Sequence, residues 1–398
     1  MDPTRRARLR LASLEAQGLL RRAPAIAHRD GVHYQLDGRK VVGLCSNDYL
    51  GLAAEPGAPA PDSTPSGAGA SRLISGDLPD HRELEARLAT LANTEDAVLF
   101  PSGFQLNVGV LPMLIEPGDH VVSDALNHAS LIDGMRLAPA RPTILPHAHA
   151  PPSRPVDTDA VHWWITETVF SMDGDCLDPA AAATHLRQGG ALYADEAHAI
   201  GLFPGGRGWL GHHGVEPTVM VGTLSKAFGC AGAFFAASRP LCDLVRNRAR
   251  SFVFTTGTSP VLVGRIARAV DLVAGPRGDH LRDRLWSNVR HLAAALRLPD
   301  RDLRSPIVPI VVGSNALAMS LASRLLDRGW HVQAIRPPTV PVGTARLRLT
   351  VSAAHEPEQI DAFAADLRAL LDRERLPLRI ERGTTTSTTS AAPPRRRA

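Results

Sequence analysis

Between residues 96 and 240 the chain alternates short apolar runs with longer stretches of helical character. The apolar runs lie at 97–100, 120–124, 162–167, 191–195, 219–223 and 232–238, and the helical stretches lie at 104–115, 128–137 and 178–189. This alternation predicts an α/β fold in which helices cover both faces of a mostly parallel sheet. A ligand is then expected at the carboxyl ends of the strands. Asp124, Glu167, Asp195 and Thr223 each end an apolar run, so we expect them to gather there.

The pattern changes after residue 240. Long amphipathic stretches at 258–297 precede three candidate strands at 306–313, 331–337 and 345–351, and a helix is predicted at 357–371. We therefore expect a smaller C-terminal α+β domain. The predicted division is an N-terminal helix and arm (1–45), a large domain that holds the site (46–240), linking helices with the small domain (241–378), and a disordered tail (379–398).

The first 22 residues are rich in arginine, but they lack the apolar segment of a secretion signal. Five leucines favour an amphipathic helix instead: Leu9, Leu11, Leu14, Leu19 and Leu20. No apolar run is long enough to span a membrane. The sequence therefore predicts a cytoplasmic protein with no membrane partner.

The formal net charge of +4 lies mostly in the C-terminal tail, where Arg382 and Arg395–Arg397 outnumber Glu381. The rest of the chain is nearly neutral, so we expect no nucleic-acid partner. The four cysteines form no CxxC pair and no metal-binding motif is present. Reduced thiols and the absence of a bound metal are therefore expected.

The segment GTLSKAFG (222–229) follows a predicted strand and sets Lys226 among small residues. Of the 44 basic residues in the chain, only Lys40 and Lys226 are lysines. Because the chain uses arginine at almost every other basic position, a lysine at this strand end indicates a specific need for an amine there. A partly desolvated lysine can be a free amine near neutral pH and form a Schiff base. A surface lysine in a flexible loop is the alternative.

The segment ALYADEAHAIG (191–201) places Asp195 at a strand end and His198 three residues later. A carboxylate in this position can keep the ring nitrogen of pyridoxal 5′-phosphate (PLP) protonated, which makes the ring an electron sink. His198 could then reach the ring hydroxyl. A helix cap with a solvent-facing histidine is the alternative, but the two strand ends together favour PLP.

Two predicted helix starts add to this site. In PSGFQLN (101–107) a helix follows a strand directly, and free backbone amides at a helix start suit a phosphate. A plain N-cap by Ser102 is the alternative. His128 begins another predicted helix, where an imidazole could stack on the ring or donate protons.

Two further segments carry candidate side chains. TETVFSMDGD (166–175) offers Glu167, Ser171 and Asp173 on the loop after a strand. Arg346 and Arg348 alternate along a predicted strand, and we expect them on opposite faces. One would face a cleft and clamp a carboxylate, while the other would be solvated or paired with an acid.

These motifs resemble those of the α-oxoamine synthases, PLP enzymes of fold type I related to the class II aminotransferases. The resemblance covers residues 10–372 and is carried by SNDYLGL (46–52), SRLISG (71–76), LNHASLIDG (126–134), TETVFSMDGD (166–175), DEAHAIG (195–201), GTLSKAFG (222–229) and RPPTVPVGTARLRLT (336–350). It implies a large PLP-binding domain, a smaller C-terminal domain and a homodimer with shared active sites.

The resemblance also implies roles for single residues. It makes Lys226, His128 and Asp195 catalytic. It assigns PLP contacts to Lys226, Gly103, Phe104, His128, Ser171, Asp195, His198, Thr223 and Thr256, the last reaching the cofactor phosphate from the partner subunit. It assigns substrate contacts to Arg21, His128, Thr339 and Arg348, with Arg348 on the carboxylate.

Segment 336–350 is most similar to family members that join L-alanine to a pimeloyl thioester, carried by CoA or acyl carrier protein, in biotin biosynthesis. The resemblance implies a decarboxylative condensation that releases CO₂ and free thiol. Loops 53–66 and 147–157 depart from the family pattern, so a glycine-using relative with a short acyl-CoA and a secondary-metabolism synthase stay open as alternatives. A PLP-binding regulator without turnover is the non-enzyme alternative, which the intact Lys226 and Asp195 argue against.

Overall fold

The computed structural model describes residues 2–21, 23–55, 63–152, 159–298, 303–378 and 380. Its main sheet has seven strands, in the spatial order β4 (Asp96–Phe100), β10 (Ala233–Ala237), β9 (Val219–Thr223), β8 (Ala191–Asp195), β7 (His162–Glu167), β5 (His120–Asp124) and β6 (Thr143–Leu145). Only β10 runs antiparallel to its neighbours, and the other paired strands are parallel. The predicted mostly parallel sheet is confirmed, with all six predicted strands ending within one residue of the expected positions.

Helices cover both faces of this sheet, as predicted. One face packs against α3 (Gly103–Leu114), α4 (Ala129–Leu137), α7 (Arg239–Arg248) and α8 (Arg250–Val253), and the other against α2 (Pro79–Ala92), α5 (Pro179–Arg187), α6 (Trp209–His212) and α9 (Pro260–Ala274). Within β10, Phe235 enters the first of these cores and Phe234 the second. Both rings are fully buried, so successive residues of the strand fill opposite cores.

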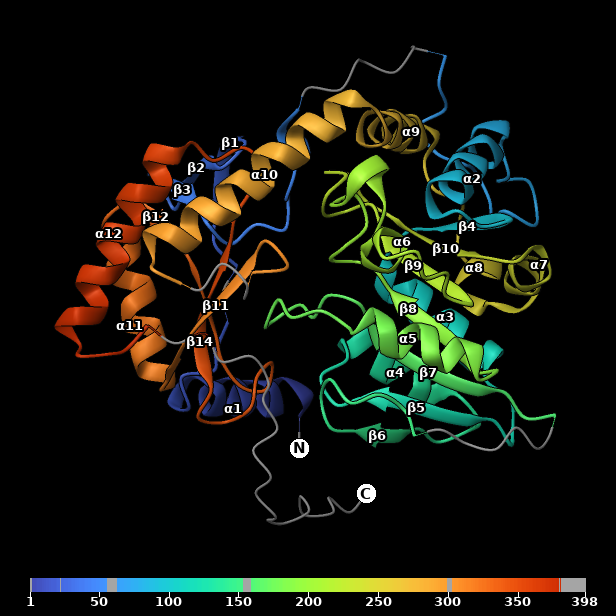
Figure 1. Ribbon diagram of the computed structural model, residues 1–398, viewed down its shortest axis with the longest axis horizontal. Coiled ribbons are helices and arrows are strands. Elements are labelled where there is room, and N and C mark those ends of the chain that lie inside the picture. Colours follow the sequence, from blue (N-terminus) through green and yellow to red (C-terminus); the bar gives the residue numbers. More distant parts are fainter. Residues whose placement is uncertain are drawn as a thin grey trace.

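The C-terminal part forms a second, smaller α+β unit of structure. Strands β11 (Ile307–Gly313), β14 (Ala345–Thr350) and β13 (Gln333–Ile335) form an antiparallel sheet, accompanied by α11 (Asn315–Leu326) and α12 (Pro357–Arg373). In Figure 1, α10 (Pro276–Ala295) runs from the region of α9 toward these elements, and α12 lies on their outer side.

The N-terminal strands join the C-terminal part. A third sheet has the order β1 (Ile26–Asp30), β2 (His33–Leu36), β3 (Arg39–Gly43) and β12 (Trp330–His331), and the β3–β12 pair is parallel. Two short 3₁₀ helices, η1 (Leu52–Ala54) and η2 (Pro204–Gly206), complete the elements. The exact domain boundaries stay a prediction. Residues 56–62 and 153–158 of the two unusual loops, and 381–398 of the predicted tail, lie outside the described residues.

The N-terminal helix α1 (Pro3–Ala16) is present but shorter than predicted, because Leu19 and Leu20 follow its end. None of its residues is buried, and Leu9, Leu11 and Leu14 are 56%, 51% and 40% exposed. No other described part of the chain therefore buries the apolar side of α1. Across the described ranges, no helix has the length and apolar character needed to cross a membrane.

Candidate active site

The carboxyl ends of the parallel strands meet at one edge of the large sheet. Strands β7, β8 and β9 end at Glu167, Asp195 and Thr223, as predicted. Glu167 and Asp195 lie directly beside each other in the β7–β8 register. The segments that leave this edge carry most of the other candidate residues.

Lys226 lies in the turn that connects β9 to β10. The turn closes through a 2.9 Å hydrogen bond from the N–H of Gly229 to the carbonyl of Lys226, and Gly229 has a left-handed φ of 62°. A Cβ on Gly229 would come within 2.4 Å of the backbone of Leu52 and Ala53. Glycine therefore allows the end of the SNDYLGL segment to pack directly on the lysine turn.

The surroundings of Lys226 favour a free amine. Burial lowers the pKa of the amine to about 8, and the charge of Arg348 acts in the same direction. The carboxyls of Asp195 and Glu167 oppose this shift, so both lie close enough to act on the amine. Because only an uncharged amine attacks a carbonyl carbon, this environment suits Schiff-base chemistry near neutral pH.

Asp195 is held by hydrogen bonds to both of its oxygens. Its Oδ2 accepts from Nδ2 of Asn107 over 2.9 Å, and its Oδ1 accepts from the N–H of Ala197 over 3.0 Å. The hydroxyl of Tyr193 donates to Oδ1 of Asn107 over 2.8 Å, which fixes the direction of the amide. Donors at both oxygens match a carboxylate, which only accepts. The carboxylate can therefore pair with a protonated ring nitrogen.

Glu167 is the second carboxyl of the site. The residue is 3% exposed, and its Oε1 has no hydrogen-bond partner within the described part of the chain. Burial raises the pKa of this carboxyl to about 8, with the charge of Asp195 adding to the shift and that of Lys226 opposing it. Glu167 therefore keeps its proton near neutral pH.

His198 is buried beside Lys226. Burial, followed by the charge of Lys226, lowers the pKa of its imidazole well below the usual value, so the ring is neutral. Its Nδ1 lies 2.7 Å from the hydroxyl of Tyr49. Burial raises the pKa of this hydroxyl to about 12, so it keeps its proton and can donate to Nδ1. The imidazole proton then resides on Nε2, which is left to donate to a ligand.

His128 lies at the start of α4 and close to Phe104 at the start of α3. The two ring centroids are 6.5 Å apart, with the planes at 80°. Nδ1 of His128 lies 2.8 Å from Oγ of Ser130 and accepts from the N–H of Ser130 over 3.2 Å, so the imidazole caps the helix. Loss of solvent lowers the pKa of His128, with Asp195 opposing and Lys226 adding to the shift, so the ring lies near both charges.

The first turn of α3 is partly exposed, with Gly103 half-buried and Phe104 47% exposed. The N–H groups of Gly103 and Phe104 have no acceptor within the helix, and Ser102 caps it by accepting from the N–H of Gln105 over 3.3 Å. The nearest atom to a Cβ built on Gly103 is 3.9 Å away, on Ala233. Free amides at a helix start suit a phosphate group.

Arg346 and Arg348 do not lie on opposite faces of β14, and that prediction was wrong. Residues two apart in a strand share a face, and both guanidinium groups reach the loop after β7. Arg346 pairs with Asp173, and Nε of Arg348 donates to the carbonyl of Ser171 over 2.6 Å. Both arginines are 5% exposed, and Nη2 of Arg348 has no partner among the described residues. An unpaired, buried guanidinium N–H is suited to bind a carboxylate.

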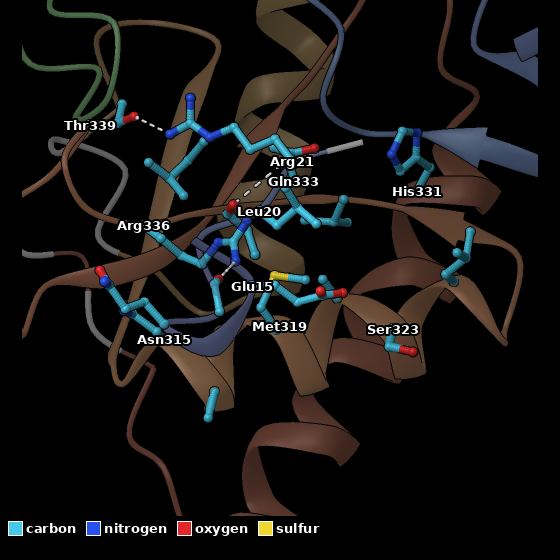
Figure 2. A pocket seen from close by; sticks show the side chains of 18 of the residues that line it. Glu15, Leu20, Arg21, Asn315, Met319, Ser323, His331, Gln333, Arg336 and Thr339 are labelled. Carbon is cyan, nitrogen blue, oxygen red and sulfur yellow. Dashed lines mark hydrogen bonds between the residues drawn. The ribbon is translucent and has the colours of Figure 1, made fainter. Parts of the chain in front are cut away.

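Arg21 and Thr339 are brought together at a separate cavity. Nη2 of Arg21 donates to Oγ1 of Thr339 over 3.2 Å, as Figure 2 shows. The cavity has a volume of about 1250 Å³ and is also lined by Glu15, Arg336 and His331, with α11 forming a further wall. Arg336 donates to the carbonyl of Gly18, which ties the segment after α1 to this wall. The two substrate candidates thus share one cavity, whereas no described contact joins them to Lys226.

Thr256 is not placed among the residues that surround Lys226. It forms an isolated bridge with Ser71, and the N–H of Gly257 donates to the carbonyl of Ala70 over 2.9 Å. This pairing connects the FTTGT segment to the SRLISG motif within one chain.

Three residues that hold the site were given no role by the sequence interpretation. Asn107 and Ser130 support Asp195 and His128, and Asn107 joins them by donating to Oγ of Ser130 over 2.9 Å. Tyr49 supports His198. An asparagine within the apolar run LNVGVL was an available signal for Asn107, because a buried amide needs a polar partner.

The fold and the site define a class of enzyme. PLP fits a site with a desolvated lysine amine, a carboxylate for the ring nitrogen, a neutral imidazole donor and a helix start for the phosphate. Glu167 and Arg348 belong to the same site, because the charges of both act on the amine of Lys226. The arrangement matches PLP-dependent enzymes of fold type I. Among the described residues, no group of three or more histidine, cysteine, aspartate or glutamate side chains could hold a metal ion.

The comparison with known families agrees with this class. Residues 39–367 match the model of the aminotransferase class I and II family. The chain therefore belongs to that family.

Individual relatives narrow the comparison. The 8-amino-7-oxononanoate synthase of Anaeromyxobacter dehalogenans is 43% identical over 378 residues, covering 91% of this chain and 94% of that protein. A solved structure of SPT with its PLP internal aldimine is similar with a TM-score of 0.83 and 26% identity, covering 95% and 100% of the two chains. The 8-amino-7-oxononanoate synthase of Francisella tularensis shares the fold, with a TM-score of 0.67, 23% identity and coverage of 84% and 99%.

Proposed function

We propose that this chain uses PLP to condense L-alanine with a pimeloyl thioester, giving 8-amino-7-oxononanoate, CO₂ and free thiol. The observation that carries the proposal is that the charges of Asp195 and Arg348 both act on the buried amine of Lys226. The chain is also 43% identical to a relative named 8-amino-7-oxononanoate synthase. This activity places the chain in biotin biosynthesis. We also propose a cytoplasmic location and neither nucleic acid nor membrane as partner.

Each of four residues of the site has a separate role in the proposed reaction. PLP, when bound, supplies an electron sink for the negative charge formed at Cα of alanine. Lys226 would hold PLP, and its amine, when free, would take the Cα proton of alanine. Asp195 keeps the positive charge on the ring nitrogen, and Nη2 of Arg348 binds the alanine carboxylate. His128, with Nδ1 engaged by Ser130, is the proton donor as CO₂ leaves.

The acyl transfer needs no reactant besides the amino acid and the thioester. Cα attacks the thioester carbonyl and expels the thiol, and the resulting β-keto acid loses CO₂. The Arg21–Thr339 cavity is the proposed site for the acyl donor, because an arginine at its wall can bind the distal carboxylate of a pimeloyl chain or the carbonyl of its ester. The acyl carrier is CoA or acyl carrier protein.

We expect L-alanine with a pimeloyl thioester to exceed glycine with acetyl-CoA in kcat/KM. One methyl group on the amino acid is worth only about 1–3 kcal/mol of discrimination between alanine and glycine. Glycine should therefore still react, but more slowly than alanine. Each extra methylene of the acyl chain adds about 0.8 kcal/mol if fully buried. A matrix of amino acids against acyl thioesters, with mass detection of the product, measures both preferences.

The same matrix separates the alternatives. A faster reaction of glycine with acetyl-CoA contradicts the proposal and favours a glycine-using relative, and turnover with no pair at all favours a PLP-binding regulator.

In Arg21→Ala, the pimeloyl reaction should fall more than the acetyl reaction. Arg10→Ala, on the exposed helix α1, is the matched control. Equal losses with both donors would show that Arg21 does not contact the acyl tail.

We propose a homodimer with shared active sites, in which Thr256 reaches the PLP phosphate of the partner subunit. Thr256 is exposed, and two apolar side chains near its bridge with Ser71 are also exposed, Ile74 at 80% and Phe254 at 71%. A second copy of the chain could cover these side chains.

A mixed dimer tests the shared site. We expect a Lys226→Ala chain, coexpressed with a chain that lacks Thr256 and its immediate neighbours, to regain one working site per heterodimer. Each variant alone should be inactive. The measurement is turnover of the purified heterodimer beside both parent homodimers. A wild-type protein that is fully active as a monomer at assay concentration contradicts the shared site.

A further inference from the structure

His147 lies outside the proposed PLP contacts but contacts the loop that carries one of them. The residue is 7% exposed, and both ring nitrogens face carboxylates. Nδ1 lies 3.0 and 3.1 Å from the two carboxylate oxygens of Asp124, and Nε2 lies 2.6 Å from Oδ2 of Asp175. A ring that donates from both nitrogens is an imidazolium. His147 therefore forms a buried charged bridge between the end of β5 and the loop after β7.

The loop 170–175 is closed on itself. The N–H of Phe170 donates to the carbonyl of Asp175 over 3.0 Å, and the N–H of Gly174 donates to the carbonyl of Phe170 over 2.9 Å. The ring of Phe170 packs edge-on against His147, with the centroids 4.4 Å apart. His147 thus contacts the loop through both a charge and a ring. Asp175 and Ser171 therefore lie in the same closed loop.

The other side of the loop contacts the C-terminal sheet. Arg346 pairs with Asp173, Nε of Arg348 donates to the carbonyl of Ser171, and Oγ of Ser305 donates to the carbonyl of Gly174 over 2.7 Å. A Cβ on Gly174 would come within 2.4 Å of the carbonyl oxygen of Ile307, so the loop lies directly on β11. The loop is therefore held between the two parts of the molecule.

We propose that His147 is a positioning residue: its bridge from Asp124 to Asp175 fixes the loop that presents Ser171 to the cofactor and orients Arg348 toward the amino-acid carboxylate. The carboxylates of Asp124 and Asp175 belong to different segments and would repel each other without a cation between them. A neutral imidazole can donate to only one of them, and no neutral side chain offsets the two negative charges. The pKa of His147, which the hydrogen bonds and charges of Asp124 and Asp175 raise to about 10 against the effect of burial, agrees with a ring that stays charged.

The test uses His147→Gln, with His185→Gln as the matched control. His185 is a half-buried histidine whose Nε2 lies 3.2 Å from the carbonyl oxygen of Ala191, and it lies on α5, away from the loop. We expect His147→Gln to raise the KM for the amino acid about tenfold with a smaller change in kcat. In the cofactor-free protein, hydrogen–deuterium exchange of peptides spanning 168–177 should rise at least tenfold, while β7 and β8 stay protected. The control should change neither quantity.

Asp175→Asn keeps the contact of His147 with Asp124 and should move both readouts in the same direction. The double variant should be no worse than His147→Gln alone, because both changes remove one bridge. An unchanged KM and unchanged loop exchange in either single variant would overturn the proposal. So would exchange that rises equally across the whole sheet, since that indicates general destabilisation. Should His147→Gln fail to fold, the result for Asp175→Asn decides.

The kinetic part rests on the proposed function, and the exchange part does not. If the wild type turns over no amino acid, the proposed function fails. The exchange of the 168–177 peptides in the cofactor-free protein still tests the role of His147 in that case.

Discussion

Lys226→Ala is expected to abolish turnover and covalent retention of PLP, with a loss of activity of at least about 10⁴-fold. The structure gives two reasons. The amine is the group whose pKa burial lowers to about 8, so it is available both to hold the cofactor and to take a proton. The only other lysine, Lys40, lies on β3 at an exposed position. The measurement is borohydride reduction of the purified protein followed by intact mass, beside an assay of thiol release.

Lys40→Ala is the matched control, because it removes the only other side-chain amine of the chain. It should retain both the mass increase after reduction and the full rate. If Lys226→Ala still gains the mass of reduced PLP at the wild-type level, the cofactor is held elsewhere and the assignment of Lys226 is wrong.

The sequence predicted six of the seven strands of the large sheet because these strands are largely buried on both faces, whereas the mostly exposed edge strand β6 was not predicted. Strands buried on both faces read as short apolar runs, and the polar residue that ends each run marks the edge where ligands bind. This is why Glu167, Asp195 and Thr223 were placed correctly at strand ends. The lysine turn was recognisable for a different reason, the near absence of lysine elsewhere in the chain.

The sequence did not predict contacts made between distant segments. The support of His198 by Tyr49 joins residues 149 positions apart, and the bridge of His147 depends on how three loops meet. A local sequence pattern does not indicate which distant segments come into contact in the fold. The face of Arg346 could have been predicted, because it follows from the two-residue period of a strand.

The N-terminal helix shows a further limit. Its leucines predict a helix with an apolar side, and the helix forms, but none of the residues that the structure describes buries Leu9, Leu11 or Leu14. A periodic pattern predicts that a face is apolar and does not identify what packs on it.

Asp195→Asn is expected to bind PLP but to lose about 10²–10³-fold in kcat, the cost typical of removing one preorganised electrostatic contact. Charge is the first reason, because a neutral amide cannot hold a proton on the ring nitrogen. Geometry is the second. Asp195 accepts from Asn107 and from the N–H of Ala197, so an amide at this position would turn its NH₂ group toward one of two donors. The hydroxyl of Tyr193 fixes the direction of Asn107, which limits relief by rotation of that amide.

The charge and the geometry can be separated by comparing three variants. Asp178→Asn changes an exposed helix cap of α5, which accepts from the N–H of Ala180, and should keep kcat within about twofold. Tyr193→Phe keeps the Asp195 carboxylate but frees Asn107, so its loss of kcat measures the geometric part alone. We expect that loss to be about tenfold or less, since one hydrogen bond between neutral groups is worth about 1 kcal/mol. Stopped-flow absorbance of the bound cofactor, with alanine and the thioester, measures each rate. If Asp195→Asn with full PLP content loses no more than Tyr193→Phe, the negative charge of Asp195 does not drive the reaction and its role is to hold Asn107 in place.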